Sequence, residues 1–304
     1  MPRSDRLSRQ RRIDSHAVAA LAPLVALFPA WLVAIAALWW VVQLFVWTPF
    51  YIFALVAFFA GGVLFLRPAQ RLVLRKLLGA RAPTRTERDA LHRAWNVVTQ
   101  ANHISPQQYV LAVADSDELN AFATGGHLVV VSSWAIENLS HDELCGVLAH
   151  ELSHHIGMHT IALTVGQWLT IPIIVLARIG FLLQNIAHAA TDTFAKRSPW
   201  AAFAGRTLTG VLTIVSWLFL SMITVSQIIG NAVGKGAEFK ADETVVDMGF
   251  GRQLRNALRI VVDSGNGARQ THWRDRLVTA HPPARTRVAR LEAHIRRTQR
   301  EQRR

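Results

Sequence analysis

The sequence has almost no cysteine and few charges. Cys145 is the only cysteine among 304 residues, so an intrachain disulfide is impossible and no cysteine cluster can bind a metal ion. We expect this thiol to fill space in a core. Only 17% of the residues are charged, 51% are apolar, and ten tryptophans accompany two tyrosines. This composition excludes an ordinary soluble protein and indicates a membrane protein.

The positive charge is concentrated in three segments that flank apolar stretches. The formal net charge is +13. Residues 1–16, 67–95 and 285–304 carry +3, +6 and +6, so the rest of the chain is slightly acidic, at −2. Basic clusters at the ends of apolar segments are typical of the cytoplasmic flanks of membrane proteins. We therefore expect a lipid bilayer as a partner, and no nucleic acid.

A long apolar stretch covers residues 17–66, which contain no Asp, Glu, Lys, Arg or His. About 20 residues cross a bilayer, so the stretch predicts two spans, at about 24–47 and 50–66, with a break near Thr48-Pro49 where proline disfavours helix. The stretch is too long for a cleaved signal peptide, and its basic flanks place both ends in the cytoplasm. The predicted turn is surrounded by rings that favour the lipid–water interface: Trp39, Trp40, Trp47 and Tyr51.

Two later apolar stretches, residues 160–183 and 208–233, are also long enough to cross a membrane, although Arg178 interrupts the first. The loop between them contains three basic residues: Lys196, Arg197 and Arg206. The positive-inside tendency would place that loop in the cytoplasm too, which conflicts with the basic flanks of the first pair. A re-entrant or interfacial pair therefore stays open as an alternative to two full spans.

Residues 80–159 have the pattern of a soluble α+β module. Thr84 and Glu87 form a capping-box pattern that predicts a helix to about Gln100. Its apolar side would consist of Ala90, Leu91, Ala94, Val97 and Val98. Two β-branched runs, at Tyr109 to Ala114 and at Leu128 to Ser132, predict adjacent strands, and Gly125-Gly126 introduces the second. A further capping box, at Ser140 and Glu143, predicts a helix through about Met158.

The last of these helices carries His150-Glu151-Leu152-Ser153-His154, the H-E-x-x-H pattern. Residues four apart on a helix project from one face, so both imidazoles can reach one tetrahedral zinc ion. Glu151 lies beside them and is suited to act as a general base toward water. A surface helix with solvated His and Glu side chains is the alternative, but the capped helix start gives the motif the context it requires.

A catalytic zinc site needs a third protein ligand and an open position. The sequence offers five candidates: His155, His159, Glu238, Asp242 and His281. His155 points about 100° away from His154 around the helix, which makes it a poor partner. Glu238 follows an apolar stretch, and a helix leaving the membrane could present its carboxylate, with Asp242 one turn on as an acceptor for a ligand imidazole. A solvated acidic face around Lys240 is the alternative that periodicity favours.

The segment Gly234-Lys235-Gly236 lies just before Glu238. Glycine is a poor residue for a helix interior, so this segment predicts that a new helix begins abruptly there. The chain would then leave the membrane region at about residue 233, and the helix that contains Glu238 would start there.

Together these motifs resemble the HtpX-like membrane zinc endopeptidases, relatives of the CAAX prenyl endopeptidases. The resemblance covers about residues 67–295. It rests on four ordered motifs: Asn120-Ala121-Phe122-Ala123-Thr124-Gly125, Asp142 to His154 with His159 beyond, Glu238 to Asp242, and His281-Pro282-Pro283 with Arg287. It implies that Glu238 is the third ligand of one Zn²⁺ per chain, that Asp242 supports a ligand from outside the coordination sphere, and that the active site faces the cytoplasm at the membrane surface.

The resemblance also implies where a substrate would bind. The strand from His127 to Ser132 is similar to the family's edge strand, on which a substrate segment would lie extended. The substrate-binding residues would be Asn120, Ala121, His127, Leu128, Val129 and Val130. Asn120 is equally suited to a turn. His281 and Arg287 match the family's His-Pro-Pro and trailing Arg, and as catalytic donors they could stabilise an oxyanion. A helix start and a solvated arginine are equally open for these two residues.

We therefore expect a mainly α polytopic membrane protein with a small β-sheet and a zincin-like metalloprotease domain at the membrane surface. It would consist of a basic cytoplasmic arm (1–16), a transmembrane hairpin (17–66), a catalytic region (67–159), a second transmembrane pair (160–233), and a region with the third ligand and a basic C-terminal helix (234–304). The expected function is zinc-dependent cleavage of membrane or misfolded proteins near the cytoplasmic face of a bacterial inner membrane, in protein quality control.

Two other functions are less favoured. An intramembrane protease would bury the motif helix in lipid, but His141, Asp142 and Glu143 make that helix too polar for lipid exposure. A catalytically silent membrane scaffold that keeps the protease fold would have no use for a general base, so the intact Glu151 argues against it.

Overall fold

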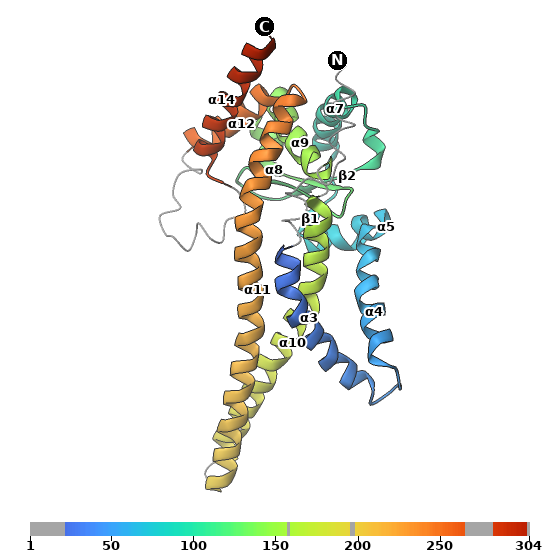
Figure 1. Cartoon of the computed structure of the whole chain (residues 1–304), viewed down its shortest axis with the longest axis vertical. Helices are drawn as coiled ribbons and strands as arrows, with labels where there is room; N and C mark the ends of the chain where they lie inside the picture. The colour runs from blue at the N-terminus through green and yellow to red at the C-terminus, as the bar shows by residue number, and fades with distance from the viewer. Residues whose placement is uncertain (1–21, 157–158, 195–197, 265–281, 303–304) are drawn as a thin grey trace. The chain divides into compact units, whose positions relative to one another are not determined.

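The computed structural model describes residues 22–156, 159–194, 198–264 and 282–302, and it is mainly helical with one four-stranded sheet, as predicted (Figure 1). Its contacts divide the chain into two compact units. We call them the helical unit (Ala22–Gly61 with Val165–Ile229) and the sheet unit (Gly62–Thr164 with Gly230–Arg304). The predicted basic arm at residues 1–16 lies outside the described residues.

Four apolar helices contribute to the helical unit: α3 (Ala22–Val42), α4 (Phe50–Ala60), α10 (His159–Phe194) and α11 (Pro199–Asp247). Within the described residues, three helices are long and apolar enough to cross a membrane: Ala22–Val42, Thr164–Thr191 and Pro199–Asp247. The apolar helix Phe50–Phe65, formed by α4 and the 3-10 turn Gly61–Phe65, is shorter. α10 and α11 are continuous helices, which favours membrane spans over re-entrant segments.

The turn between α3 and α4 is longer than predicted. Helix α3 ends at Val42 rather than near residue 47, because two side chains hold the chain in a turn before the proline. The Trp39 Nε1–H donates to the Thr48 carbonyl at 2.7 Å, and the Gln43 amide donates to the same oxygen. Pro49 is then the residue that caps α4, so the predicted break at Thr48-Pro49 is confirmed.

The core of the helical unit lies where α3 contacts α10 and α11. It consists of Leu27, Ala30, Trp31, Ala34, Ile35, Leu169, Ile173, Ala177, Phe219 and Ile223. Between α10 and α11 side chains pack directly on glycines, since a Cβ on Gly180 would clash with Ser216 Oγ and one on Gly205 would clash with Thr191 Oγ1. Small residues at helix crossings are typical of membrane helices, in which packing rather than the hydrophobic effect drives association.

The predicted helix start at Gly234-Lys235-Gly236 is wrong. Helix α11 runs through these residues without a break, from Pro199 to Asp247. A glycine inside a helix costs only about 1 kcal/mol, which the rest of this long helix can offset. Glu238 therefore lies on α11 itself.

The sheet has the strand order β1-β2-β4-β3. The strands are β1 (Ala80–Arg81), β2 (Val110–Ala114), β3 (Ala121–Thr124) and β4 (Leu128–Ser132). Strands β2 and β4 are parallel neighbours, so the predicted pairing of these two runs is confirmed. Strand β3 pairs antiparallel with β4 through the Gly125-Gly126 turn, in which both glycines have positive φ, at 63° and 78°. Only glycine adopts that conformation without strain.

The predicted edge strand at His127 to Ser132 is wrong. Strand β4 lies between β2 and β3, so both of its sides are hydrogen-bonded within the sheet. All five of its residues are buried. Its backbone at Leu128, Val129 and Val130 cannot pair with a substrate, and the outer strand on this side is β3.

Helix α7 (Arg85–Ala101) has the predicted capping box, in which Glu87 N–H donates to Thr84 Oγ1 and Thr84 N–H donates to Glu87 Oε2. One predicted core residue is wrong, because Val97 is 44% exposed. Trp95 is buried in its place. The helix is turned slightly relative to the predicted apolar side, so that the large indole fills the core.

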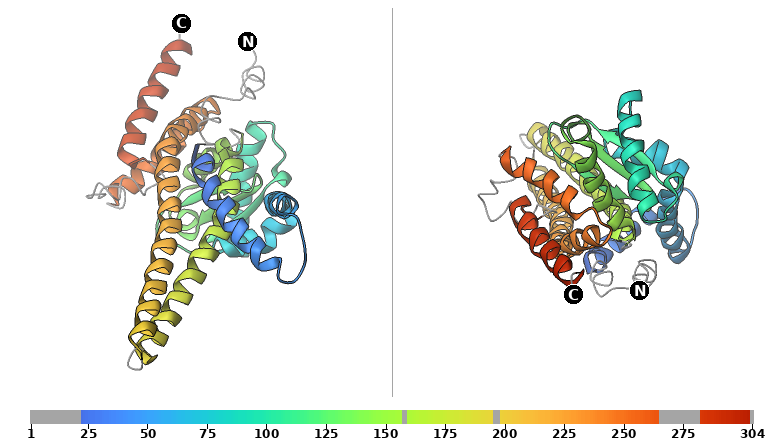
Figure 2. Two further views of the ribbon diagram at one scale, coloured as in Figure 1. Left: turned by 60° about the horizontal axis from the view of Figure 1, so that its bottom comes forward. Right: turned by 90° about the horizontal axis from the view of Figure 1, so that it is seen from above.

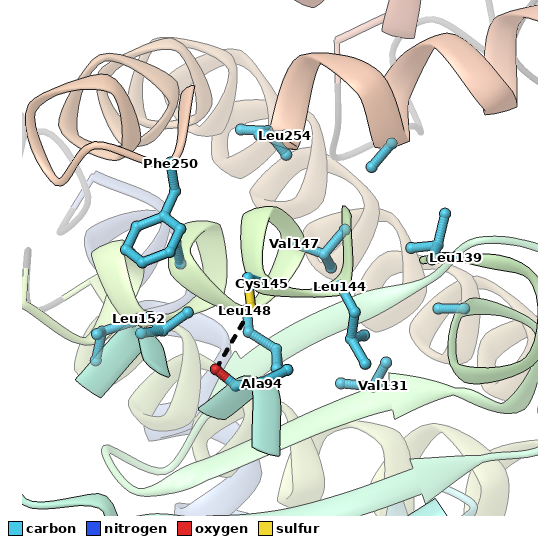
Figure 3. Packing of buried hydrophobic residues seen from close by; sticks show 14 of the residues in the cluster. Ala94, Val131, Leu139, Leu144, Cys145, Val147, Leu148, Leu152, Phe250 and Leu254 are labelled. Carbon is cyan, nitrogen blue, oxygen red and sulfur yellow. Dashed lines mark hydrogen bonds between the residues drawn. The ribbon is translucent and has the colours of Figure 1, made fainter. Parts of the chain in front are cut away.

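Helix α9 (His141–Ile156) is central to the sheet unit and packs against α7, β3 and α12 (Gly251–Asp263). Helix α12 also packs against α14 (Ala284–Gln302), and the view from above shows these two helices side by side (Figure 2). Cys145 is buried among apolar side chains, with its Sγ 3.7 Å from the Ala94 carbonyl, as expected for a packing residue (Figure 3). The shorter elements are α5 (Arg67–Ala69), a π-turn (Gln70–Leu74), α6 (Arg75–Leu77), a 3-10 turn (Pro106–Gln108) and α8 (Ser133–Asn138).

Candidate metal centre

Helix α9 holds the H-E-x-x-H motif because its start is fixed by the predicted capping box. The Ser140 N–H donates to Glu143 Oε2 at 2.8 Å, and the Glu143 N–H donates to Ser140 Oγ at 3.3 Å. One helical turn then separates His150 from His154, and their Nε2 atoms lie 3.2 Å apart. The two imidazoles are therefore directed at one point, as the motif predicts.

Helix α11 brings a carboxylate to the same point. Glu238 Oε2 lies 3.3 Å from His150 Nε2, and Glu238 Oε1 lies 3.1 Å from His154 Nε2. One ligand atom from each of the three residues lies within 4.8 Å of the others. The structure thus brings together the three residues that the sequence singled out, although 84 positions separate His154 from Glu238.

The spacing of these atoms fits a tetrahedral zinc ion. Zinc–nitrogen and zinc–oxygen bonds of about 2.0–2.1 Å in a tetrahedron place neighbouring ligand atoms about 3.3 Å apart. The separations here are 3.2 Å between the imidazoles and 3.1 and 3.3 Å from each imidazole to the carboxylate. Two imidazoles and one carboxylate are also a donor set found in catalytic zinc sites. This cluster could hold a metal ion.

A buried ion pair lies behind His150. Asp242, one turn after Glu238 on α11, has its Oδ1 3.1 Å from His150 Nδ1. Arg287 of α14 donates to both carboxylate oxygens of Asp242, from Nη2 at 2.7 Å and from Nε at 2.9 Å. Its Nη1 lies 3.5 Å from Glu238 Oε2. Arg287 therefore contacts both carboxylates on α11, and its Nη2 also lies 3.3 Å from the ring nitrogens of His150 on α9.

The electrostatic field at the cluster favours positive charge. Burial and the nearby Arg287 lower the pKa of His150, but the carboxylates of Glu238 and Asp242 outweigh both and raise it to about 9. The same two carboxylates that attract a proton to this imidazole would attract a metal cation. The guanidinium of Arg287 is already paired with Asp242.

Glu151 is buried beside His150, with 3% of its surface exposed. Its charge is one of those that act on Arg287, which places its carboxylate in the electrostatic surroundings of the site. Its role as a general base close to a metal ion stays a prediction.

The other residues predicted near the site have different outcomes. His155 turns away from the cluster, as expected from the helix geometry, and its ring packs on Tyr109 at 4.9 Å between centroids. The side chain of His159 and the whole of His281 lie outside the described residues. Arg287 is 7% exposed, and its guanidinium forms an ion pair with Asp242. This arrangement favours a role in holding the Asp242 carboxylate in place over a role as an oxyanion donor.

The predicted substrate residues lie on β3 and β4 or directly before them. Asn120 immediately precedes β3: its N–H donates to Ser132 Oγ at 3.1 Å, and its carbonyl accepts from the Ser132 N–H at 2.8 Å. Ala121 follows in β3, which packs against α9. His127 uses its carbonyl to accept from the Val110 N–H, inside the sheet. The sequence did contain a signal for β3, because Gly-Gly between two short apolar runs is a hairpin pattern.

Comparisons with known proteins agree with the resemblance that the motifs predicted. Residues 85–295, more than half of the chain, match peptidase family M48. Protease HtpX of Shewanella frigidimarina is 28% identical over 264 residues, covering 79% of this chain and 87% of the relative. Protease HtpX of Shewanella loihica is 30% identical over 200 residues, covering 63% of this chain and 66% of the relative. The crystal structure of S. mikatae Ste24p aligns with a TM-score of 0.47 at 17% identity, over 90% of this chain and 63% of that one.

Proposed function

Because this chain belongs to peptidase family M48 and is a membrane protease, we propose that it is a zinc-dependent endopeptidase that cleaves membrane or misfolded proteins at the cytoplasmic face of a bacterial inner membrane. The convergence of His150, His154 and Glu238 within 4.8 Å of one another carries the proposal. These three residues would hold one Zn²⁺. When bound, the ion would act as a Lewis acid and lower the pKa of water.

Glu151 is the general base of the proposed mechanism. Its buried carboxylate takes a proton from the attacking water and returns it to the nitrogen of the leaving amine, so one residue serves both proton transfers. Burial keeps bulk water from competing for that proton. Asp242 accepts a hydrogen bond from His150 Nδ1, which leaves the Nε2 lone pair available for the ligand position.

Arg287 acts through Asp242 and Glu238 rather than on the substrate. The guanidinium holds the Asp242 carboxylate in the orientation that His150 requires, and it offsets part of the negative charge of two adjacent carboxylates. The proposed role of His281 as an oxyanion donor depends on the family resemblance alone.

The outer edge of β3 is the proposed binding site for the substrate backbone. This strand is an edge of the sheet and packs against α9, the helix with the motif. An extended segment that pairs with β3, beginning near Asn120 and Ala121, would be held by main-chain hydrogen bonds, and such pairing accepts many side-chain sequences. Broad acceptance of extended segments suits the removal of misfolded proteins, as expected in quality control.

The test is casein cleavage and self-cleavage by the full chain purified in detergent, with and without a zinc chelator. Glu151→Gln should keep its zinc and lose cleavage by more than about a hundredfold, whereas Glu137→Gln, an exposed glutamate on α8, should leave both unchanged. Full activity in Glu151→Gln would remove it from the mechanism. Zinc-loaded wild-type protein that cleaves nothing would instead favour the silent scaffold.

A further inference from the structure

A charged side chain lies in the apolar surface of the helical unit. Arg178 is on α10 within the apolar stretch Thr164–Thr191, and it is exposed. Among the described residues it makes no hydrogen bond and no ion pair. A guanidinium does not lose its proton in proteins, so this position carries a permanent positive charge. Such a charge in a membrane span is costly unless it has a partner.

The helical unit has no suitable partner of its own. Its two segments, 22–61 and 165–229, contain a single acidic residue, Asp192. Asp192 is fourteen residues farther along α10, which corresponds to about 21 Å along the helix axis. The helical unit of a second copy would bring the same shortage of acidic groups. These helices therefore supply no counter-charge near Arg178, whereas a bilayer does.

The depth of Arg178 follows from contacts inside the helical unit. The Trp168 Nε1–H donates to the Ala57 carbonyl at 2.9 Å, so these two residues lie at one level of α10 and α4. The two helices run in opposite directions (Figure 1). Phe50, the first residue of α4, lies seven residues before Ala57, and Val175 lies seven residues after Trp168. Phe50 and Val175 are therefore at about the same level. The turn that precedes Phe50 is therefore at the level of Arg178.

Contacts of α10 with α3 and α11 also place the aromatic residues near the α3–α4 turn at the level of Arg178. Leu24 of α3 packs on Gly166 of α10, and the two helices run in the same direction. Trp39 lies fifteen residues after Leu24, and Phe181 lies fifteen residues after Gly166, so Trp39 and Phe181 are at the same level. The Phe181 ring packs edge to face on Trp217 of α11, at 6.1 Å between centroids. Three exposed indoles thus lie near the level of Arg178: Trp40, Trp47 and Trp217, which are 67%, 83% and 61% exposed.

A belt of tryptophan with an arginine is typical of the lipid–water interface, where the guanidinium extends to the headgroups. The length of α10 agrees with a boundary there. Its 36 residues are about 54 Å long, and the hydrocarbon core is only about 30 Å thick. A tilt that placed the whole helix in the core would exceed the observed range of about 0–40°.

We propose that Arg178 lies at the headgroup boundary on the side of the α3–α4 turn and binds the phosphate of a phospholipid there. Phosphate is the anion that a bilayer presents at this level, and a guanidinium binds its oxygens through two parallel N–H donors. The parts of α10 and α11 beyond this level, from about Leu182 to Ile214, then continue past the hydrocarbon core as a paired helical hairpin.

The lipid is tested by native mass spectrometry of the full chain in detergent with added phosphatidylglycerol. Arg178→Leu should bind the lipid about tenfold more weakly than the wild type. Arg252→Leu, which removes the same charge from an exposed position on α12, should bind it as the wild type does. Excess inorganic phosphate should not displace the lipid. Equal lipid binding in all three proteins, or displacement by inorganic phosphate, would overturn the proposal.

The boundary is tested separately, with Arg178 in place, in vesicles of phosphatidylcholine and phosphatidylglycerol. Ile186→Cys and Val175→Cys introduce thiols at positions that are 57% and 41% exposed, and the wild type with its buried Cys145 is the blank. A water-soluble maleimide should label Ile186→Cys more than about tenfold faster, because only Val175 lies in the hydrocarbon core. Equal labelling of the two variants would place Arg178 away from the boundary and contradict the proposal.

Discussion

Arg287 on α14 donates two hydrogen bonds to Asp242 on α11, at 2.7 and 2.9 Å, and this pair joins α14 to the helix that carries Glu238. Asp242 in turn contacts His150 on α9. A chain of three polar residues therefore connects three helices behind the metal cluster. The geometry of the cluster depends on the docking of α14, which lies in the last part of the sequence.

Arg287→Ala should weaken both the fold and metal binding. Removing one partner of a buried ion pair leaves an unpaired charge and costs about 3–5 kcal/mol, and losing the support of a ligand lowers metal affinity about 10- to 100-fold. Zinc affinity by chelator competition, with the thermal midpoint, measures both effects. Arg285→Ala, an exposed neighbour on α14, is the control. Unchanged affinity in Arg287→Ala would mean that the ion pair does not support the cluster.

Gly146→Ala should destabilise the packing of α9 on α12. A Cβ at Gly146 would lie 2.3 Å from the backbone nitrogen of Leu254, so one of the two helices must move. We expect a loss of about 1–3 kcal/mol in the free energy of unfolding, measured by thermal or denaturant unfolding in detergent. At Gly210 on α11 a Cβ would meet nothing within 4 Å, so Gly210→Ala should be tolerated. Equal stability of both variants would show that α9 and α12 are less closely packed than described.

Cys145 should resist thiol reagents in the folded protein. Burial, and to a smaller extent the charge of Asp142, raise the pKa of this thiol to about 11, so little thiolate exists near neutral pH. Iodoacetamide at pH 8 should label the native chain slowly and the denatured chain quickly. Rapid labelling under native conditions would contradict the buried position of the side chain.

The ion pair of Glu87 with Arg81 should contribute to stability in a pH-dependent way. The hydrogen bond from Arg81 lowers the pKa of Glu87 to about 2, from 4.5 in the unfolded chain. A depressed pKa means that the contribution is present above pH 4.5 and is lost as the pH falls towards 2. Arg81 is partly exposed, so the effect should be no more than about 1 kcal/mol. The stability difference between wild type and Glu87→Gln should therefore shrink below pH 4.5; a constant difference would contradict the assignment.

Much of the site was predictable because its signals are local. The capping boxes at Thr84 and Ser140 fix helix starts through residues three positions away, and the two histidines of the motif need only one helical turn to converge. Glu238 is different, because its approach to His154 depends on how α11 packs against α9. Periodicity alone favoured a solvated acidic face there, and the resemblance to a known family was needed to prefer a ligand.

Two of the wrong predictions concern tertiary arrangement. The order of strands in a sheet is not encoded in the composition of one strand, so the sequence of β4 does not show that the short strand β3 pairs with its outer side. Val97 and Trp95 differ by about 160° around α7, and which of the two faces the core depends on how α7 packs against its neighbours.

The most direct test is the metal content of the purified chain and of Glu238→Ala. We predict about one zinc per chain in the wild type and a large loss in the variant, because two histidines alone make up an incomplete site. Folding is checked in parallel by the helical circular dichroism signal. A well-folded Glu238→Ala protein with one zinc per chain would contradict the account, since the carboxylate of α11 would then not be a ligand.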